Sequence, residues 1–370
     1  MDPATLERLI VKEIRKAREI SRRDLADRLV IAKSTAGRRI DSMIERGIVR
    51  ETGIEDRKEV GRPRRFLDLV PSYGSYAGFD FDARHLYAVL IDYAQGELSR
   101  EKIRLSSAPN RDELLGHLRN LIAGFRENAS GMPLHAVGIG VPGHVRRESR
   151  TSVYYPFISD WHQVDLATEL DLEPSLLHIE NNTRAILLGE YWNGPLAGSE
   201  NLACINVRTG IAAAVIANGA LISGEHEMAG EIRGWPVSEH DWLEKVATVR
   251  AVIDGEAPGS DRWFEFVTAC LESDPASLAT LEEAATHHGA AAARIVQLLD
   301  PKAVFFAGPF TELESLYLDR VRNAVAASLD GHYFTSPPIL AASLGEYAGA
   351  HGAAALAAAE TPLPDTEQTV

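Results

Sequence analysis

The chain has few of the residues that mark secreted, thiolate-metal or membrane proteins. Its 370 residues include 2 cysteines, Cys204 and Cys270, too few for a disulfide framework or a zinc site built from thiolates. No window approaches the roughly 18 consecutive apolar residues of a membrane span. The charged N-terminal stretch does not resemble a signal peptide. We therefore expect a cytoplasmic protein that does not associate with a membrane.

Basic residues are scarce over most of the chain and are concentrated at its start. Residues 1–70 carry 18 Lys and Arg against 13 Asp and Glu, a net charge of +5, whereas residues 71–370 carry 20 against 40, a net charge of −20. This asymmetry is typical of a chain of which one end meets a polyanion, although a small basic domain can also be a solvated surface. The length exceeds what one hydrophobic core usually serves, so two or three domains are expected.

Residues 1–70 predict a winged helix-turn-helix domain. Three short amphipathic helices are expected over residues 5–17, 21–29 and 34–46, separated by three or four residues. Ser21 and Asp24 predict a capping box for the second helix, and Ser34 is expected to cap the third. Short strands at residues 48–50 and 66–69 then predict a wing.

The third predicted helix and the wing carry the side chains expected to contact DNA. On the helix these residues are Lys33, Ser34, Thr35, Arg38 and Arg39. In the wing they are Arg62, Arg64 and Arg65, which flank the rigid Pro63. We expect the helix to enter the major groove and the wing arginines to reach the electronegative minor groove. The alternative for the wing is a solvated basic loop.

Beyond a turn-rich linker at residues 71–75, strands alternate with helices. Strands are expected at residues 76–81, 86–92, 97–105 and 136–141 with a helix at 112–127, and in a second round at 202–207, 212–218, 220–223 and 303–306 with a helix at 276–299. Two rounds of one ribonuclease-H-like motif predict an α/β body with two lobes and a cleft between them. We expect a first lobe at residues 76–185, completed by a closing helix at 347–359, a second lobe at 186–346, and a disordered tail at 361–370.

The stretch His178–Trp192 places polar side chains where a buried strand passes directly into a helix. Glu180, Asn181 and Asn182 lie at this junction, outside the carboxyl end of the strand, where open α/β sheets bind ligands. They are candidates for holding a polyol. Alternatively, Asn182 or Thr183 simply caps the helix.

Taken in order, several stretches resemble the ROK family of bacterial repressors, sugar kinases and uncharacterised proteins. They are GIGVPG at 138–143, DWHQVDLATELDL at 160–172, IENNTRAILLGE at 179–190, TGIAAAVIANGALISG at 209–224, AGEIRGWPV at 229–237 and WLEKVA at 242–247. The resemblance extends over residues 6–359, and GRPRR at 61–65 is typical of the repressor branch. It implies a winged helix-turn-helix followed by an actin-like, sugar-kinase body.

The catalytic parts of the family's kinases are altered here. In the kinases, an aspartate follows the asparagine of the strand-to-helix turn and acts as general base, whereas this chain has Asn182, whose amide cannot take a proton. The phosphate loops also differ, with Asp-Phe-Asp-Ala-Arg at 80–84, Arg-Thr-Gly at 208–210 and Ala-Gly-Pro at 307–309. We therefore expect no ATP-dependent phosphoryl transfer and no cofactor.

The family's zinc ligands are missing, and its sugar contacts are kept except for the one expected from the histidine among those ligands. Gly234 replaces the histidine ligand and residues 238–242 contain no cysteine, so we expect no metal. The resemblance implies that Asn181, Glu231 and Glu244 hydrogen-bond sugar hydroxyls, with Asn182 replacing the aspartate. For Glu231, an ion pair with Arg233 or Arg184 is the alternative.

These features predict a DNA-binding transcriptional regulator, most simply a repressor, whose body senses a sugar or sugar derivative without phosphorylating it. We expect a double-stranded operator as partner and a homodimer or homotetramer, because one winged domain buries little surface. The alternatives are an ATP-dependent sugar kinase with a fused DNA-binding head and a DNA-binding protein that responds to no ligand.

Overall fold

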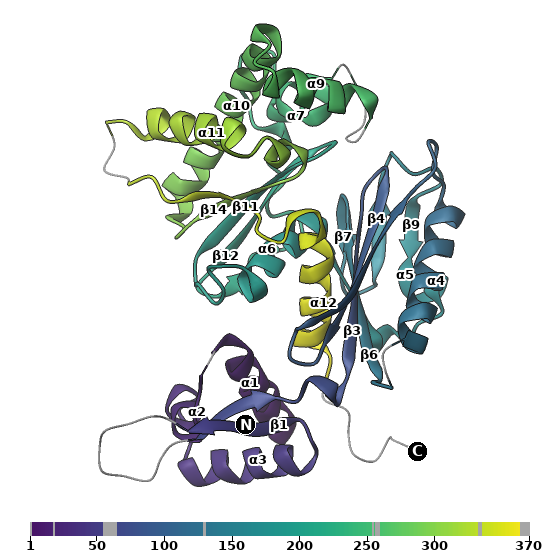
Figure 1. The fold of residues 1–370 in the computed structure, drawn as a ribbon, viewed down its shortest axis with the longest axis vertical. Helices are drawn as coiled ribbons and strands as arrows, with labels where there is room; N and C mark the ends of the chain where they lie inside the picture. The colour runs from purple at the N-terminus through teal and green to yellow at the C-terminus, as the bar shows by residue number, and fades with distance from the viewer. Residues whose placement is uncertain are drawn as a thin grey trace.

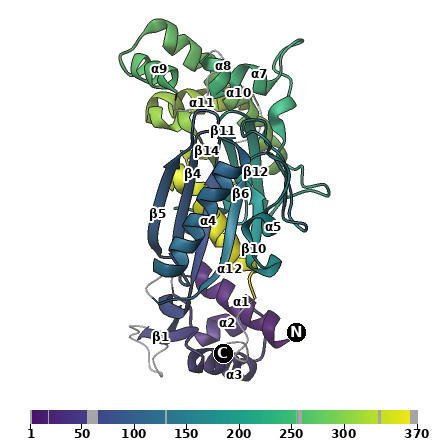
Figure 2. The same ribbon diagram turned by 90° about the vertical axis from the view of Figure 1, so that its right-hand side faces the viewer.

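A helical head lies at one end of the molecule, and two α/β lobes extend from it (Figures 1 and 2). The computed structural model describes residues 2–17, 19–54, 65–128, 131–253, 255, 260–331 and 335–362. Within these ranges, none of the helices combines the length and the apolar character needed to span a membrane.

The head is a winged helix-turn-helix. Its elements are α1 (Pro3–Lys16), α2 (Arg22–Arg28), α3 (Lys33–Glu45) and the antiparallel strands β1 (Val49–Ile54) and β2 (Arg65–Leu69). The predicted capping box of α2 is confirmed, because the Asp24 carboxylate accepts from the Ser21 backbone N–H at 3.0 Å and the Ser21 hydroxyl accepts from the Asp24 backbone N–H at 3.3 Å. The prediction that Ser34 caps α3 is wrong. The helix begins at Lys33, and the cap position holds Ala32, which has no side-chain acceptor.

The first lobe is a five-stranded mixed sheet covered by helices on both faces. Its strands lie in the order β10 (Leu177–Asn181), β6 (Leu134–Val141), β3 (Ser75–Phe81), β4 (His85–Asp92) and β5 (Glu97–Arg104). α4 (Arg111–Asn128) covers one face and α12 (Ala348–Glu360) the other (Figure 1). A small sheet of β7 (His144–Arg146), β8 (Thr151–Tyr154) and β9 (His162–Asp165) follows β6 and leads into α5 (Leu166–Leu170).

The second lobe repeats this plan. Its strands lie in the order β13 (Ala220–Leu221), β12 (Ile211–Ala217), β11 (Leu202–Val207), β14 (Val304–Ala307) and β15 (Ile339–Ala341). One face packs on α6 (Asn182–Asn193), and the other on α10 (Pro275–Leu299) and α11 (Glu314–Leu329). Three further helices, α7 (Leu243–Ala247), α8 (Val249–Val252) and α9 (Asp261–Leu271), lie before α10. The boundary expected between residues 185 and 186 falls inside α6.

The lobes meet where α6 packs against α12, and small residues let these elements approach closely. A Cβ placed on Gly138 of β6 would lie 1.8 Å from the Ala353 carbonyl oxygen of α12. A Cβ placed on Gly352 of α12 would lie 1.6 Å from the Ala185 carbonyl oxygen of α6. Contacts this close require glycine, which explains the Gly and Ala run of the closing helix.

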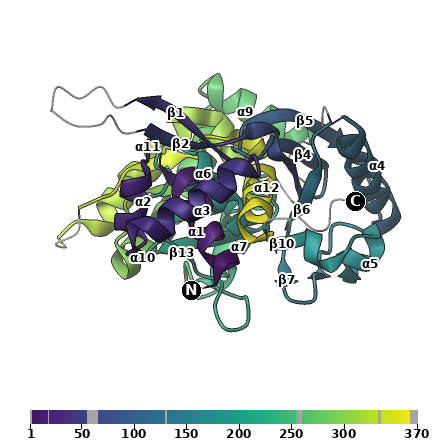
Figure 3. The ribbon, with the colours of Figure 1, turned by 90° about the horizontal axis from the view of Figure 1, so that it is seen from below.

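The head shares a buried cluster with the body. Val11 and Ile14 of α1 belong to the same cluster as Tyr76 of β3 and Ala357 of α12. The connecting residues Pro71–Tyr73 form a 3-10 turn, and the Tyr73 ring lies 4.8 Å from that of Tyr93. Seen from the head's end, α12 is visible beside α1 and α3 (Figure 3). The head is therefore packed onto the body and is more than a tethered module.

Candidate functional site

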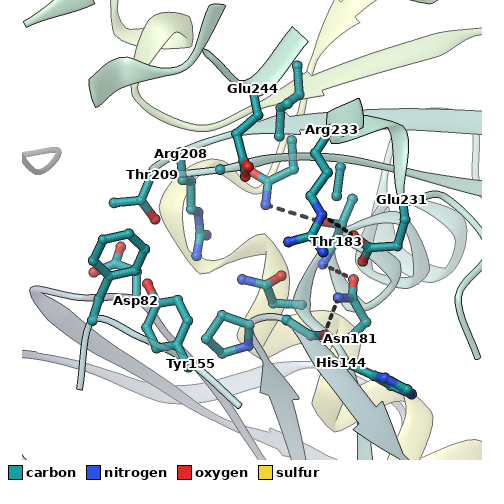
Figure 4. Close-up of a pocket in the computed structure, with 18 of the residues that line it drawn as sticks. Asp82, His144, Tyr155, Asn181, Thr183, Arg208, Thr209, Glu231, Arg233 and Glu244 are labelled. Carbon is teal, nitrogen blue, oxygen red and sulfur yellow. Dashed lines mark hydrogen bonds and ion pairs between the residues drawn. The ribbon is translucent and has the colours of Figure 1, made fainter. Parts of the chain in front are cut away.

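A cavity of about 280 Å³ lies between the two lobes. Its lining includes all four residues expected to bind sugar, namely Asn181, Asn182, Glu231 and Glu244. Figure 4 shows Glu244 and Arg233 extending into the cavity from the second lobe, on the side opposite Tyr155 of the first lobe. Folding thus brings together amide and carboxylate groups from distant parts of the sequence, since Asn181 and Glu244 are 63 positions apart.

Asn181 fixes the strand-to-helix turn between β10 and α6. Its side-chain oxygen accepts from the backbone N–H groups of Thr183 at 2.9 Å and Arg184 at 3.3 Å, and its amide nitrogen donates to the Gly143 carbonyl at 2.9 Å. Asn181 is therefore the cap of α6, in place of Asn182 or Thr183. The Asn182 side chain has no hydrogen-bond partner among the described residues, which leaves its amide available to the cavity.

Glu180 does not line the cavity, so its candidacy as a polyol ligand is wrong. Its carboxylate is fully buried behind the turn and accepts from the Arg184 Nε at 2.6 Å, and Arg147 Nε lies 3.3 Å away. Burial raises the pKa of Glu180, and the two arginines oppose that rise. Arg184 also donates to the Glu227 carbonyl at 3.1 Å. This buried network holds the loop that leads to Glu231.

The two cavity carboxylates have different surroundings. Glu231 pairs with Arg233, with Nε and Oε2 3.6 Å apart, so one of the two predicted alternative partners is present. The other, Arg184, pairs with Glu180 instead. Glu244 lies in the first turn of α7, and the structure gives its side-chain oxygens no ion pair within the described ranges. Glu244 is thus the carboxylate best able to accept from a ligand hydroxyl.

An ion pair beside the cavity joins the two lobes. Arg208, at the end of β11, donates to Asp80, at the end of β3, at 2.9 Å. Burial raises the pKa of Asp80 to about 6, against the opposing charge of Arg208. Sequence reasoning missed this pair because it noted Arg208 only as a change in a phosphate loop. An arginine directly after the largely apolar run 202–207 is the signal that could have indicated a carboxylate partner.

The Asp82 side chain hydrogen-bonds to the backbone of its own turn, between β3 and β4. Its Oδ1 accepts from the backbone N–H groups of Arg84 and His85, each at 2.8 Å. In the kinases that this chain resembles, the backbone amides of this loop approach phosphate. Here a carboxylate of the chain already occupies two of them.

The residues expected to bind DNA divide into exposed and internally paired groups. Lys33, Ser34 and Arg38 are exposed on α3, which forms the outer end of the head (Figures 1 and 3). Thr35 is half-buried. Arg39 donates to the buried Glu7 of α1 at 3.0 Å.

The three arginines expected in the wing are Arg62, Arg64 and Arg65. Arg65 opens β2 and donates to Glu51 of β1 at 2.8 Å. Arg62 and Arg64 lie outside the described residues. Of the three wing arginines expected to contact DNA, Arg65 is therefore the one that the structure describes, and Glu51 holds it on the strand pair.

Two family models match the chain. One, described as the ROK family, matches residues 76–240 and 260–360, and the other, described as winged helix-turn-helix DNA-binding, matches residues 4–50. The chain belongs to the ROK family. Its winged head followed by a ROK body is the architecture of the family's repressors.

Relatives of this ROK protein include both repressors and kinases. It is 24% identical over 345 residues to a xylose repressor from Caldicellulosiruptor bescii, with 86% of each chain covered. It is 28% identical over 323 residues to a glucokinase from Streptomyces coelicolor, with 78% of this chain and 99% of the kinase covered. A solved ROK family transcriptional regulator, a homologue of the E. coli MLC protein, has a TM-score of 0.74 at 18% identity and 97% coverage of each chain, a likeness of fold.

The turn that corresponds to the ROK zinc site does not fit a zinc ion. The Ser238 hydroxyl accepts from the backbone N–H groups of His240 at 3.3 Å and Asp241 at 3.1 Å, and the Asp241 carboxylate pairs with Lys245. Within the described ranges, no three metal-ligating side chains lie together. The turn is closed by its backbone, with Leu243 N–H donating to the Trp235 carbonyl at 2.9 Å.

Proposed function

We propose that this ROK protein is a transcriptional repressor that binds operator DNA with its winged head and senses a sugar or sugar derivative in its interlobe cavity without phosphorylating it. The observation that carries the proposal is that the chain has a polar cavity for a ligand, while the Asp82 carboxylate occupies the loop amides that would approach phosphate. The repressor relative aligns over 86% of this chain, whereas the glucokinase relative aligns over 78% of it.

The cavity has the groups that a ring of hydroxyls requires. Glu231 and Glu244 accept hydrogen bonds, and the Asn182 amide can both donate and accept. The Asn181 oxygen is used in the cap of α6, so Asn181 has one N–H left to donate to a ligand. Each neutral hydrogen bond contributes about 1 kcal/mol net. The volume of about 280 Å³ lies at the small end of ligand pockets, which favours a monosaccharide or a derivative of similar size.

Three features of the cavity oppose phosphoryl transfer. Asn182 has no basic lone pair with which to deprotonate a sugar hydroxyl. Asp82 occupies backbone amides of the first loop and adds a negative charge where phosphate would approach. Arg208 of the second loop is committed to Asp80 across the cleft. These changes lie in separate parts of the chain, so a single neighbouring residue cannot compensate for all of them.

Thermal unfolding with a panel of sugars tests the sensing half of the proposal. We expect one monosaccharide, tried first with D-xylose and D-glucose, to raise the Tm of the wild-type chain. Glu244→Gln should abolish most of that rise, because the amide offers one acceptor where the carboxylate offers two. Glu283→Gln, on the exposed face of α10, is the matched control and should keep it. Equal Tm rises in both variants would remove Glu244 from the site.

Two further measurements separate the repressor from its rivals. An ADP-release assay with MgATP and the same sugars should show no turnover above background, and steady turnover would establish the kinase reading. A gel shift on a duplex selected from a random pool should show affinity that changes when the stabilising sugar is added. Unchanged affinity would favour a DNA-binding protein without an effector.

We also propose that the chain acts in the cytoplasm as a homodimer or homotetramer. Two heads related by two-fold symmetry would read two half-sites of a palindromic operator. Light scattering of the purified chain, free and bound to the selected duplex, measures the number of subunits. A monomer on DNA would overturn this part of the proposal.

A further inference from the structure

One helix, α12, reaches from the Asp80–Arg208 ion pair beside the interlobe cavity to the DNA-binding head. Its 13 residues span about 20 Å at 1.5 Å per residue. Its N-terminal end touches the ion pair of the cavity, because a Cβ placed on Gly349 would lie 2.3 Å from Asp80 Oδ2. A change at the Asp80–Arg208 pair is therefore a change at the first turn of α12.

Close packing along α12 leaves little room to absorb a displacement. A Cβ on Gly78 of β3 would lie 2.0 Å from the Ala350 carbonyl oxygen, and α6 contacts the opposite side of the helix at Gly352. Interiors packed at this density transmit strain. When the lobes move relative to each other, α12 must shift with them or slide along α6.

At its other end α12 is fastened to the head by Arg15 of α1. Arg15 Nη1 donates to the Ala358 carbonyl at 2.6 Å, and Nη2 donates to the Tyr93 carbonyl at the end of β4 at 3.3 Å. The guanidinium also lies over the Tyr93 ring, 5.1 Å from its centroid. Ala358 is in the last turn of α12, where carbonyls lack partners within the helix and a cation is favoured.

The rest of this contact is looser. A cavity of about 270 Å³ lies beside Arg15, between α1 and the body, and is lined by Arg8, Lys12 and Trp192 among others. Of the described residues of α1, Arg15 is the one whose side chain hydrogen-bonds to the body. The orientation of α1 on the body thus depends on the hydrogen bonds from Arg15 to two carbonyl groups. The cation–π and apolar contacts around them can readjust.

We propose that Arg15 is a positioning residue that passes a shift of α12 to the DNA-binding head. The inference rests on the proposed function in one respect, because it explains how occupancy of the cavity would alter operator affinity. When the first turn of α12 moves with the cleft, the Ala358 carbonyl carries Arg15 and α1 with it. The position of α3, which packs on α1, then changes with respect to the second head of the assembly.

A double-mutant cycle on operator affinity tests this role without any sugar. The cleft change is Asp80→Asn combined with Arg208→Met, which removes the ion pair without leaving a lone buried charge. The head change is Arg15→Met, which keeps an apolar stem against the tyrosines but removes the donors. Distant independent sites give additive effects, so a deviation from additivity measures coupling.

We expect the cleft change to alter the operator Kd at least about fivefold when residue 15 is arginine and less than about twofold when it is methionine, in line with ordinary allosteric couplings. Arg8→Met, on an exposed position of the same helix, is the control and should leave the effect of the cleft change intact. Thermal unfolding of each variant shows that the fold is kept.

An equal effect of the cleft change on the wild-type head and on the Arg15→Met head would overturn the proposal, and so would a cleft change without effect on the wild-type head. If the two cleft substitutions prevent folding, Arg208→Lys, which keeps the charge, serves as the cleft change in the same cycle. Failure of the proposed sensing function is distinguishable, because it appears as a lack of response to any sugar while the cycle stays non-additive.

Discussion

Arg38 and Arg39 are consecutive on α3, but their side chains have different surroundings. Arg38 is exposed at the outer end of the head, whereas Arg39 donates to Glu7 on α1. Arg46 donates to the other oxygen of Glu7 at 2.8 Å. The buried Glu7 carboxylate is therefore held by two arginines, and of the consecutive pair we propose that Arg38 contacts DNA.

Alanine substitutions should separate these two functions. Arg38→Ala should weaken binding to the selected operator at fixed salt by about tenfold or more, because a base or phosphate contact is lost, and should leave the Tm unchanged. Arg39→Ala should lower the free energy of unfolding by about 1–3 kcal/mol, because Glu7 keeps only one partner. Gel shifts and urea unfolding measure the two effects. If Arg39→Ala left stability unchanged, the Glu7 pair would not contribute to the head's fold.

The helices and strands with strong apolar periods could be predicted from the sequence to within two residues at each end. β11 was predicted with the bounds Leu202–Val207 that the structure has. β7, β8 and β9 were missed because strands of three or four residues with charged and polar members, such as His144–Arg146, carry no usable period. The cap of α2 was predicted correctly, whereas those of α3 and α6 were misplaced by one or two residues.

The candidate site was accessible to sequence reasoning only in part. The family motifs indicated Asn181, Asn182, Glu231 and Glu244, and all four line one cavity. The Asp80–Arg208 pair was not predicted, because its partners are 128 positions apart and come together only when both lobes are folded. The sugar-binding role of the four residues and the regulatory role of the pair remain predictions.

At the scale of elements, replacing glycine by alanine should have opposite effects on stability at two positions, Gly138, which lies against α12, and Gly116, which lies within α4. Gly138→Ala should lower the free energy of unfolding by about 3 kcal/mol, since its methyl group would overlap the Ala353 carbonyl of α12. Gly116→Ala in α4 should raise it by about 0.5–1 kcal/mol, because nothing lies within 4 Å of the new Cβ and alanine favours the helix. Urea midpoints measure both, and changes of equal sign would contradict the close approach of α12 to β6.

For the whole molecule, the opposite charges of head and body should appear as a strong salt dependence of DNA binding. The basic head faces a polyanion while the body, with its net charge of −20, is repelled by it. A dimer that neutralises about six phosphates should lose roughly a thousandfold in affinity between about 50 and 200 mM salt. Sugar binding in the interlobe cavity should change little over that range. Fluorescence anisotropy measures the first, and a loss below tenfold would mean that few phosphates are contacted.

The position of α12 at the end of the described chain affects how the protein is made. α12 covers β3 and β6 and completes the buried cluster that the head shares with the body, yet it leaves the ribosome roughly 270 residues after β3. At about 5–20 residues per second, the apolar faces of α1 and the first sheet wait for tens of seconds without their cover. The first domain to be synthesised is thus among the last to be finished, and messages that end before codon 348 should yield heads that form but aggregate through the face that α12 would have covered.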